Sequence, residues 1–159
     1  MNVMVRPVRG SDGYALKAIE KHSFPSDSWH PEDFLSRDCL VAELESGFIA
    51  GYLVSQEICP PLPGTPPERE ILNLAVDIPY RRKGIAARLL EAELARGGIH
   101  FLEVRESNNA AQMLYRKFGF REIARRPEYY RAPVEAAMVM RSYPGLQRAR
   151  PAIVMDWKW

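Results

Sequence analysis

The sequence is 159 residues long and carries 22 lysines and arginines against 20 aspartates and glutamates, for a formal net charge of +2. This length suits one domain that is large enough to bury a hydrophobic core. The balanced charge does not support nucleic-acid binding, and no stretch approaches the roughly 18 apolar residues that a membrane span needs. Because residues 1–9 alternate instead of forming an apolar run, we expect no signal peptide and a cytoplasmic protein without nucleic-acid or membrane partners.

The N-terminal half predicts a strand, two helices and a hairpin. Residues 3–8 are β-rich and alternate as in a strand, and Ser11 stands where the N-cap of a following helix belongs. Residues 28–34 carry acidic side chains where the first turn of a second helix is expected. Residues 40–44 and 48–58 are strand-like segments with a glycine between them, which predicts two strands joined by a tight turn.

The C-terminal half predicts strands that alternate with helices. Residues 59–68 contain five prolines and predict an irregular loop, not a domain linker, because neither side alone has a complete core. Beyond this loop we expect, in chain order, a strand at 71–76, a helix at 85–96 that stops at two glycines, a strand at 100–104, a helix at 111–118, and paired strands near 121–124 and 136–140. This order predicts a single α/β or α+β domain at residues 1–143 with helices on both faces of a mixed sheet, followed by a tail at 144–159.

The connection between the strand at 71–76 and the next helix combines cationic residues with a glycine. Arg81, Arg82 and Lys83 attract phosphate oxygens, and Gly84 allows a ligand to approach the backbone closely. Unpaired N–H groups in the first turn of the helix also favour an anion. The pattern indicates a phosphate site that is neither a Walker A loop nor a GxGxxG loop. A surface helix start with solvated arginines is the alternative interpretation.

This turn resembles a known family signature. Arg81-x-x-Gly84-x-Ala86 is similar to the Gln/Arg-x-x-Gly-x-Gly/Ala motif of the GNAT acyltransferase superfamily, and residues 72–76 resemble the fourth strand of that fold. The resemblance implies a mixed, mostly antiparallel sheet of six to seven strands. It also implies that acetyl-CoA is the cosubstrate, with its pantetheine arm along the strand and its pyrophosphate on the amides of the turn. The residues implied as cofactor contacts are Leu74, Ala75, Val76, Arg82, Lys83, Gly84, Ile85, Ala86 and Ala87.

Residues 102–120 narrow the resemblance to one branch of the superfamily. Together with Arg125-Arg126-x-x-Tyr129-Tyr130, they are similar to the RimI-like enzymes, which acetylate the N-terminal alanine of a small-subunit ribosomal protein. The likeness extends from about residue 5 to residue 140. It implies a protein N-terminus as the acceptor amine, with a ribosomal protein as a candidate partner.

Glu103 is the candidate general base. It alternates with Leu102 and Val104, so on a strand its side chain faces away from these two apolar neighbours. A free α-amino group has a pKa near 8 and must lose a proton before it attacks a thioester, and a carboxylate at the carboxyl end of a strand is able to take that proton. The resemblance implies this role for Glu103. An ordinary ion pair, for instance with Arg105, is the alternative.

Tyr115 and Asn108 each have a structural and a functional interpretation. Tyr115 lies on the apolar stripe of its helix and suits core packing, whereas the resemblance implies that it protonates the departing CoA thiolate. Asn108 suits a helix N-cap, a position that Ser107 or Asn109 would also fill, and the resemblance implies a CoA contact. A bulged strand near Leu74 is the usual device for polarising the acetyl carbonyl, but the sequence cannot show one.

The cysteines and histidines predict neither a metal site nor a covalent intermediate. Cys39 and Cys59 lie outside the matched motifs, and the three histidines have no metal-ligand spacing. We expect free thiols, although a single disulfide stays open. The expected reaction is therefore direct transfer of acetyl to a primary amine, without a nucleophilic cysteine or a metal.

Three departures from the RimI-like pattern affect the predicted specificity. The stretch from Gly84 to Glu103 is shorter than expected, Glu135 stands one position earlier than the usual acidic residue, and the loop at 59–68 and the tail, with Trp157 and Trp159, look like additions. Two alternatives therefore remain beside N-terminal acetylation. The first is acetylation of a small-molecule amine or a lysine side chain, and the second is a CoA-binding regulatory or assembly protein that does not catalyse.

Overall fold

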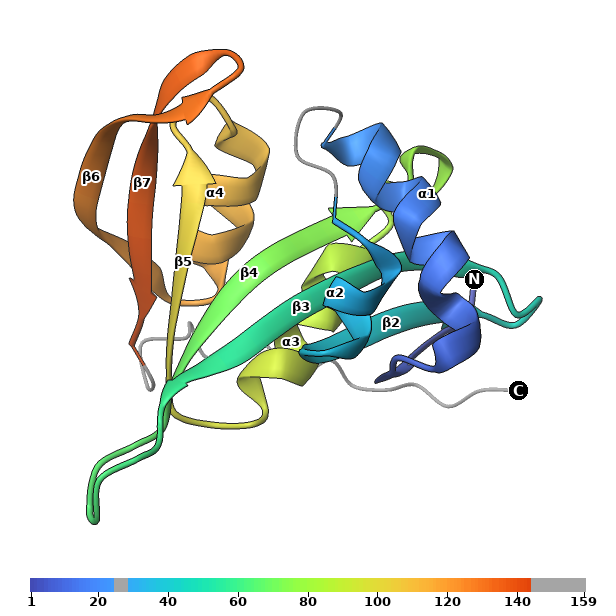
Figure 1. Cartoon of the computed structure of the whole chain (residues 1–159), viewed down its shortest axis with the longest axis horizontal. Coiled ribbons are helices and arrows are strands. Elements are labelled where there is room, and N and C mark those ends of the chain that lie inside the picture. Colours follow the sequence, from blue (N-terminus) through green and yellow to red (C-terminus); the bar gives the residue numbers. More distant parts are fainter. Residues whose placement is uncertain (25–28, 144–159) are drawn as a thin grey trace.

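The computed structural model describes residues 1–24 and 29–143, and its elements follow the predicted order (Figure 1). The predicted tail, with Trp157 and Trp159, lies outside the described residues. In chain order the elements are β1 (Val3–Pro7), a 3-10 turn η1 (Gly10–Asp12), α1 (Gly13–Ser23), α2 (Pro31–Leu35), β2 (Asp38–Leu44), β3 (Ile49–Cys59), β4 (Glu68–Val76), a 3-10 turn η2 (Ile78–Tyr80), α3 (Ile85–Leu94), β5 (Ile99–Arg105), α4 (Asn109–Lys117), β6 (Phe120–Arg131) and β7 (Val134–Ser142).

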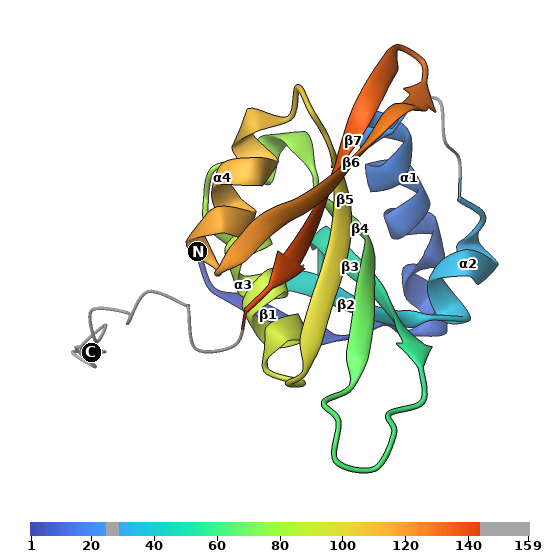
Figure 2. The ribbon, with the colours of Figure 1, turned by 90° about the vertical axis from the view of Figure 1, so that its left-hand side faces the viewer.

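The seven strands form one mixed sheet in the order β1-β2-β3-β4-β5-β7-β6. Only β4 and β5 pair in parallel, and all other neighbours are antiparallel. Helices α1 and α2 cover one face of the sheet, and α3 and α4 cover the other (Figure 2). Each face has its own hydrophobic core, one built around Leu16, Ile19 and Phe34 and the other around Leu89, Leu90 and Met140. The predicted fold class is confirmed.

The sheet opens between its two parallel strands. The pairing of β4 with β5 runs from Glu68 opposite Ile99 to Ile71 opposite Leu102 and ends there. Next to this point β4 has a bulge, because Val54 and Ser55 of β3 face Asn73 and Ile71 and leave Leu72 without a partner. A bulge increases local twist, and β4 and β5 diverge visibly beyond it (Figure 1). The divergence creates space at the centre of the sheet.

Buried polar side chains lie at the other, closed end of β4 and β5. Arg69 of β4 donates from Nε to Glu93 of α3 at 2.9 Å, and Nε2 of His100 on β5 lies 3.6 Å from the same carboxylate. The side chains of Glu93 and His100 are fully buried. Breaking a buried ion pair by removing one partner is strongly destabilising. The Glu93 carboxylate therefore lies against both strands at the end where they stay paired, whereas the bulge marks the end where they diverge.

Two predicted details need correction or refinement. Ser11 is not the N-cap of α1, because it lies inside η1 and Asp12 precedes the helix. The Asp12 carboxylate accepts a hydrogen bond from the Arg9 amide at 2.7 Å and pairs with Arg6 at 2.8 Å, and this second contact holds the pKa of Asp12 below its ordinary value. The proline-rich loop predicted at 59–68 is the end of a long β3–β4 hairpin, which runs to Cys59 and resumes at Glu68 and projects from the body (Figure 2).

Gly98 makes the loop before β5 sensitive to substitution. Gly97 and Gly98 have φ values of 79° and 83°, but only at Gly98 would a Cβ atom meet a backbone atom, the Pro67 oxygen at 2.2 Å. We expect Gly97→Ala to lower the free energy of unfolding by about 1–2 kcal/mol through its left-handed backbone. Gly98→Ala should lower the free energy of unfolding by the same amount and by about 1–3 kcal/mol more, because its Cβ atom overpacks against Pro67.

Denaturant titration of both variants tests this comparison. Gly97→Ala is the matched control, because a Cβ atom there would have no neighbour within 4 Å. The Ile99 amide donates to the Pro67 oxygen at 2.9 Å, so the oxygen cannot move away without losing that hydrogen bond. Equal losses of stability in the two variants would show that the Pro67 oxygen moves away from the new Cβ atom without a cost in stability.

Candidate active site

The space between the diverging strands forms a cavity of about 350 Å³. Its walls come from both faces of the sheet: Ser23, Phe24 and Trp29 lie on the side of α1 and α2, whereas Asn108, Ala111 and Tyr115 belong to α4 or its start. Between them lie the bulged segment of β4 and the end of β5. A ligand in this cavity is therefore accessible to chemical groups from both faces of the sheet.

A second cavity, of about 530 Å³, adjoins the first. It is lined by residues of β4, β5 and the β6–β7 hairpin, among them Glu70, Tyr129 and Arg131. Residues that line both cavities are Ile71, Leu72, Glu103, Arg105, Tyr130 and Ala132. Glu103 therefore stands where the two cavities meet, which is the position that a group acting on two substrates needs.

The Glu103 carboxylate is held from β6. Its Oε1 lies 3.1 Å from Nε of Arg126, and the Glu103 side chain is only 17% exposed. The Tyr129 hydroxyl also contacts Glu103, and this hydrogen bond raises the pKa of Tyr129.

Arg105, the ion-pair partner considered from the sequence, pairs instead with Glu135 at 3.4 Å. Its guanidinium lies 4.1 Å from the ring centroid of Tyr130, a residue whose pKa burial raises to about 12.

Tyr115 contributes both to the core and to the cavity. Its ring packs 5.7 Å from the ring of Phe120, and the residue is 8% exposed. It also lines the smaller cavity together with Glu103. Burial raises the pKa of Tyr115 above its ordinary value, because a phenolate is poorly solvated there. The phenol therefore keeps its proton throughout the neutral pH range, as a proton donor must.

The turn before α3 has the backbone of an anion site. Arg82 and Gly84 have positive φ values of 62° and 81°, and Gly84 directly precedes the helix. The first intrahelical acceptor is the Gly84 oxygen, which receives the Arg88 amide at 3.1 Å, so the amides of residues 85–87 are left for a ligand. Exposed Arg82 and Lys83 add positive charge. These features fit a diphosphate group.

Arg81, the first residue of the motif, has a structural role in this turn. Its Nε donates to the Val76 oxygen at 2.9 Å and its Nη2 to the Ser23 hydroxyl at 3.2 Å. These two contacts fix the turn to the end of β4 and to α1. On β4 itself, Leu74 lines the smaller cavity, whereas the side chains of Ala75 and Val76 are buried in the two cores. Any cofactor contact of Ala75 or Val76 must therefore use the backbone.

Asn108 is the N-cap of α4 and also lies at a cavity wall. Its side chain accepts a hydrogen bond from the Ala111 amide at 3.1 Å, which makes it the N-cap of α4. Asn108 also lines the smaller cavity. Capping thus orients a polar side chain at the cavity wall.

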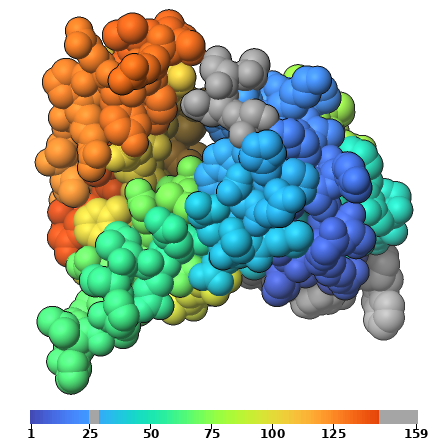
Figure 3. Space-filling model, in the orientation of Figure 1, coloured from blue at the N-terminus to red at the C-terminus, as the bar shows by residue number. Residues whose placement is uncertain are grey.

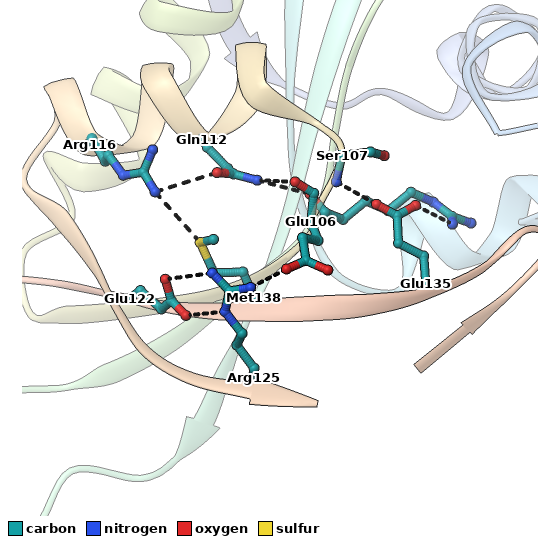
Figure 4. Close-up of polar contacts among 9 residues, drawn as sticks. Glu106, Ser107, Gln112, Arg116, Glu122, Arg125, Glu135 and Met138 are labelled. Carbon is teal, nitrogen blue, oxygen red and sulfur yellow. Dashed lines mark hydrogen bonds and ion pairs between the residues drawn. The ribbon is translucent and has the colours of Figure 1, made fainter. Parts of the chain in front are cut away.

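Polar contacts on the outer side fix the loop between β5 and α4 (Figure 4). The amide of Ser107 donates to Glu135, and Gln112 donates from Nε2 to the Glu106 oxygen at 2.8 Å. Glu135, which departs by one position from the expected pattern, thus bridges Ser107 and Arg105. This network sets the position of α4, and with it that of Tyr115.

The sequence signal did not identify Glu70, Arg126, Tyr129 or Tyr130 as site residues with roles. The last three belong to the RimI-like pattern, but the pattern assigns them no contact with Glu103, because that contact depends on how β6 bends.

In the part of the chain that the structure describes, no group of three or more His, Cys, Asp or Glu residues is placed to hold a metal, and no helix is long and apolar enough to cross a membrane. Cys39 is buried, Cys59 is exposed, and both are free thiols.

Comparisons with known proteins agree with this geometry. Residues 36–122 match the family described as acetyltransferase (GNAT) domain. The chain is 42% identical over 152 residues to the N-alpha-acetyltransferase RimI of Mycobacterium tuberculosis, and the aligned region covers 90% of this chain and 94% of the relative. It is 35% identical over 118 residues to the [ribosomal protein bS18]-alanine N-acetyltransferase of Escherichia coli, and here the aligned region covers 69% of this chain and 73% of the relative.

Solved structures show the same fold. The crystal structure of the Escherichia coli ribosomal-protein-S18-alanine N-acetyltransferase has a TM-score of 0.73 at 28% identity, over 89% of this chain and 93% of that one. The crystal structure of Arabidopsis thaliana NAA60 in complex with acetyl-CoA has a TM-score of 0.76 at 20% identity, over 89% of this chain and 99% of that one. The second likeness concerns the fold alone.

Proposed function

The chain belongs to the GNAT family of acetyl-CoA-dependent N-acetyltransferases, and we propose that its acceptor is the N-terminal amino group of a protein. The names of two relatives, an N-alpha-acetyltransferase and a ribosomal protein bS18 alanine N-acetyltransferase, support this acceptor class. The observation that carries the proposal is that Glu103 lines both cavities. A base in that position reaches an amine in one cavity and a thioester in the other.

Acetyl-CoA supplies an acetyl thioester, and this chain supplies the groups that hold it. The amides of residues 85–87 and the side chains of Arg82 and Lys83 bind the pyrophosphate. Asn108 and the backbone of residues 74–76 bind the pantetheine arm. The bulge at Leu72 supports this assignment, because it accompanies the loss of pairing with β5 and leaves the edge of β4 open to a ligand.

Transfer then needs one proton acceptor and one proton donor. Glu103 takes a proton from the acceptor's amino group, whose nitrogen attacks the thioester carbon directly. The carbon–sulfur bond breaks, and Tyr115 gives its proton to the departing thiolate. The burial of the Tyr115 side chain supports this role, since it keeps the phenol protonated until the thiolate develops. No covalent enzyme intermediate is formed.

Mass spectrometry of acetylated peptides tests the acceptor class. Peptides that begin with alanine, serine or methionine are incubated with acetyl-CoA and the enzyme, and we expect a gain of one acetyl group at the α-amine. One of these peptides reproduces the N-terminus of the organism's own bS18 protein. The same peptides with a blocked N-terminus and an internal lysine are the control. Modification of lysine or small amines alone would contradict the proposal.

A further inference from the structure

We propose that Arg126 is a positioning residue for the transfer: it fixes the Glu103 carboxylate through one oxygen, and its charge favours the neutral, nucleophilic form of the bound amine. This inference rests on the proposed role of Glu103 as the base. The supporting contact is the ion pair of Arg126 Nε with Glu103 Oε1 at 3.1 Å. Glu103 lines both cavities, and Arg126 contacts it from outside their walls.

The irregularity of β6 just beyond Arg126 brings Tyr129 to the carboxylate that Arg126 contacts. Pairing passes from Arg126 opposite Ala137 to Tyr130 opposite Glu135, so β6 contains two more residues than β7 across this step. Glu128, within the extra segment, has a φ of 49°. In a regular strand residues 126 and 129 would point to opposite faces. The irregularity instead allows both Arg126 and Tyr129 to contact the same carboxylate.

Arg126 reaches this position although its side chain is largely exposed. The side chain is 58% exposed, against 17% for Glu103, and its guanidinium lies 5.6 Å from the centroid of the Tyr129 ring. Exposed ion pairs contribute little to stability. The contact is therefore better explained by its effect on the Glu103 carboxylate than by a contribution to folding.

The other charged and titratable groups at the site are engaged elsewhere or uncharged. Arg105 pairs with Glu135, and Glu70 of β4 accepts a hydrogen bond from Gln56 at 3.3 Å. The neighbouring phenols of Tyr129 and Tyr130 have raised pKa values and carry no charge at neutral pH. The remaining cation that lines the larger cavity is Arg131, for which no contact with Glu103 is seen among the described residues. Arg126 is thus the cation in direct contact with the base.

The positive charge of Arg126 disfavours a second cation bound beside the Glu103 carboxylate. An amine that binds beside the Glu103–Arg126 pair is repelled in its ammonium form but not in its neutral form, which lowers the pKa of the bound amine. Loss of the charge should therefore move the pH at which the bound amine becomes reactive upward, by about one unit. The same loss should tighten binding of the ammonium form.

The test is the pH dependence of kcat and of KM for an acceptor peptide in three variants. With Arg126→Gln, we expect the acidic limb of the kcat profile to move up by about one pH unit, so that kcat near pH 7 falls about tenfold and recovers at high pH. KM for the peptide at low pH should fall. With Arg126→Lys, which keeps the charge, the limb should stay close to that of the unmodified enzyme.

Arg125→Gln is the matched control. Arg125 is the preceding residue of β6 and its loss changes the net charge equally, but its side chain pairs with Glu122 and Glu106 on the outer side (Figure 4). The limb position does not depend on the fraction of active enzyme, so incomplete folding cannot imitate the shift. If Arg126→Gln and Arg125→Gln give the same limb, the inference is wrong. If the unmodified enzyme acetylates only other amines, the proposed acceptor fails, while the limb comparison with those amines still tests Arg126.

Discussion

Replacing Glu103 with glutamine lowers kcat for acceptor peptides by about 10²–10⁴-fold near neutral pH. Glutamine keeps the size of the side chain but cannot accept a proton from the amine. It also leaves Arg126 without its ionic partner, so a cation stands beside the attacking nitrogen without a compensating charge. The loss should decrease at high pH, where more of the amine is already neutral. Steady-state kinetics across pH, with KM for acetyl-CoA measured in parallel, checks this result.

Glu106→Gln is the control for loss of a carboxylate. Glu106 lies three residues beyond Glu103, pairs with Arg125 and lines neither cavity (Figure 4). The kcat of the Glu106→Gln variant should stay within a few-fold of the kcat of the unmodified enzyme. A loss of less than tenfold in Glu103→Gln, about 1.4 kcal/mol of barrier, would contradict the assignment of the base. Unchanged turnover in both variants would place the base elsewhere.

The order of the elements was predictable because it depends on local periodicity. Apolar residues at helical spacing from Ile85 to Leu94 predicted a helix at 85–96, and α3 starts at the predicted residue and ends two residues earlier, before the two glycines. The alternation around Glu103 placed its side chain away from the core that contains Leu102 and Val104, as the structure has it. Such signals lie within one segment of the chain and need no knowledge of its neighbours.

Strand register was not predictable from the same signals. Leu72 fits an apolar strand equally well with or without a bulge, so nothing in residues 71–76 shows where pairing with β5 ends. In the same way, the spacing of Arg126 and Tyr129 suggests opposite faces until the irregularity between β6 and β7 is known. Both features depend on partner strands that are distant in the sequence. They create the opening and complete the surroundings of Glu103.

The structure also shows that several alternatives considered for single residues are compatible. Asn108 caps α4 and lines the cavity, and Tyr115 packs in the core and lines the cavity. A side chain that is already fixed by a structural contact loses little further freedom when a ligand binds. The same logic applies to Arg81, whose contacts with Val76 and Ser23 hold the turn in shape. A structural role for these residues is therefore compatible with the functional role proposed for them.

Tyr115→Phe should lower kcat by about 10²–10⁴-fold, while KM for acetyl-CoA and for the peptide stays within a few-fold. Phenylalanine keeps the packing against Phe120 but has no proton for the departing thiolate. Burial raises the pKa of Tyr115, so the acid form is present at all pH values below the ordinary phenol value near 10. Ionisation of Tyr115 itself should therefore cause no loss of activity between neutral pH and that value.

Tyr52→Phe removes the same hydroxyl at a comparable depth from a residue outside the cavity walls. Tyr52 is fully buried in the core beside α1 and α2 and lines neither cavity. Its turnover should match that of the unmodified enzyme, and thermal unfolding of both variants separates lost folding from lost chemistry. If Tyr115→Phe retains more than a tenth of kcat, solvent protonates the thiolate and Tyr115 serves packing alone. If both Tyr115→Phe and Glu103→Gln bind CoA but neither lowers turnover, the cavity binds a ligand whose chemistry these two residues do not perform.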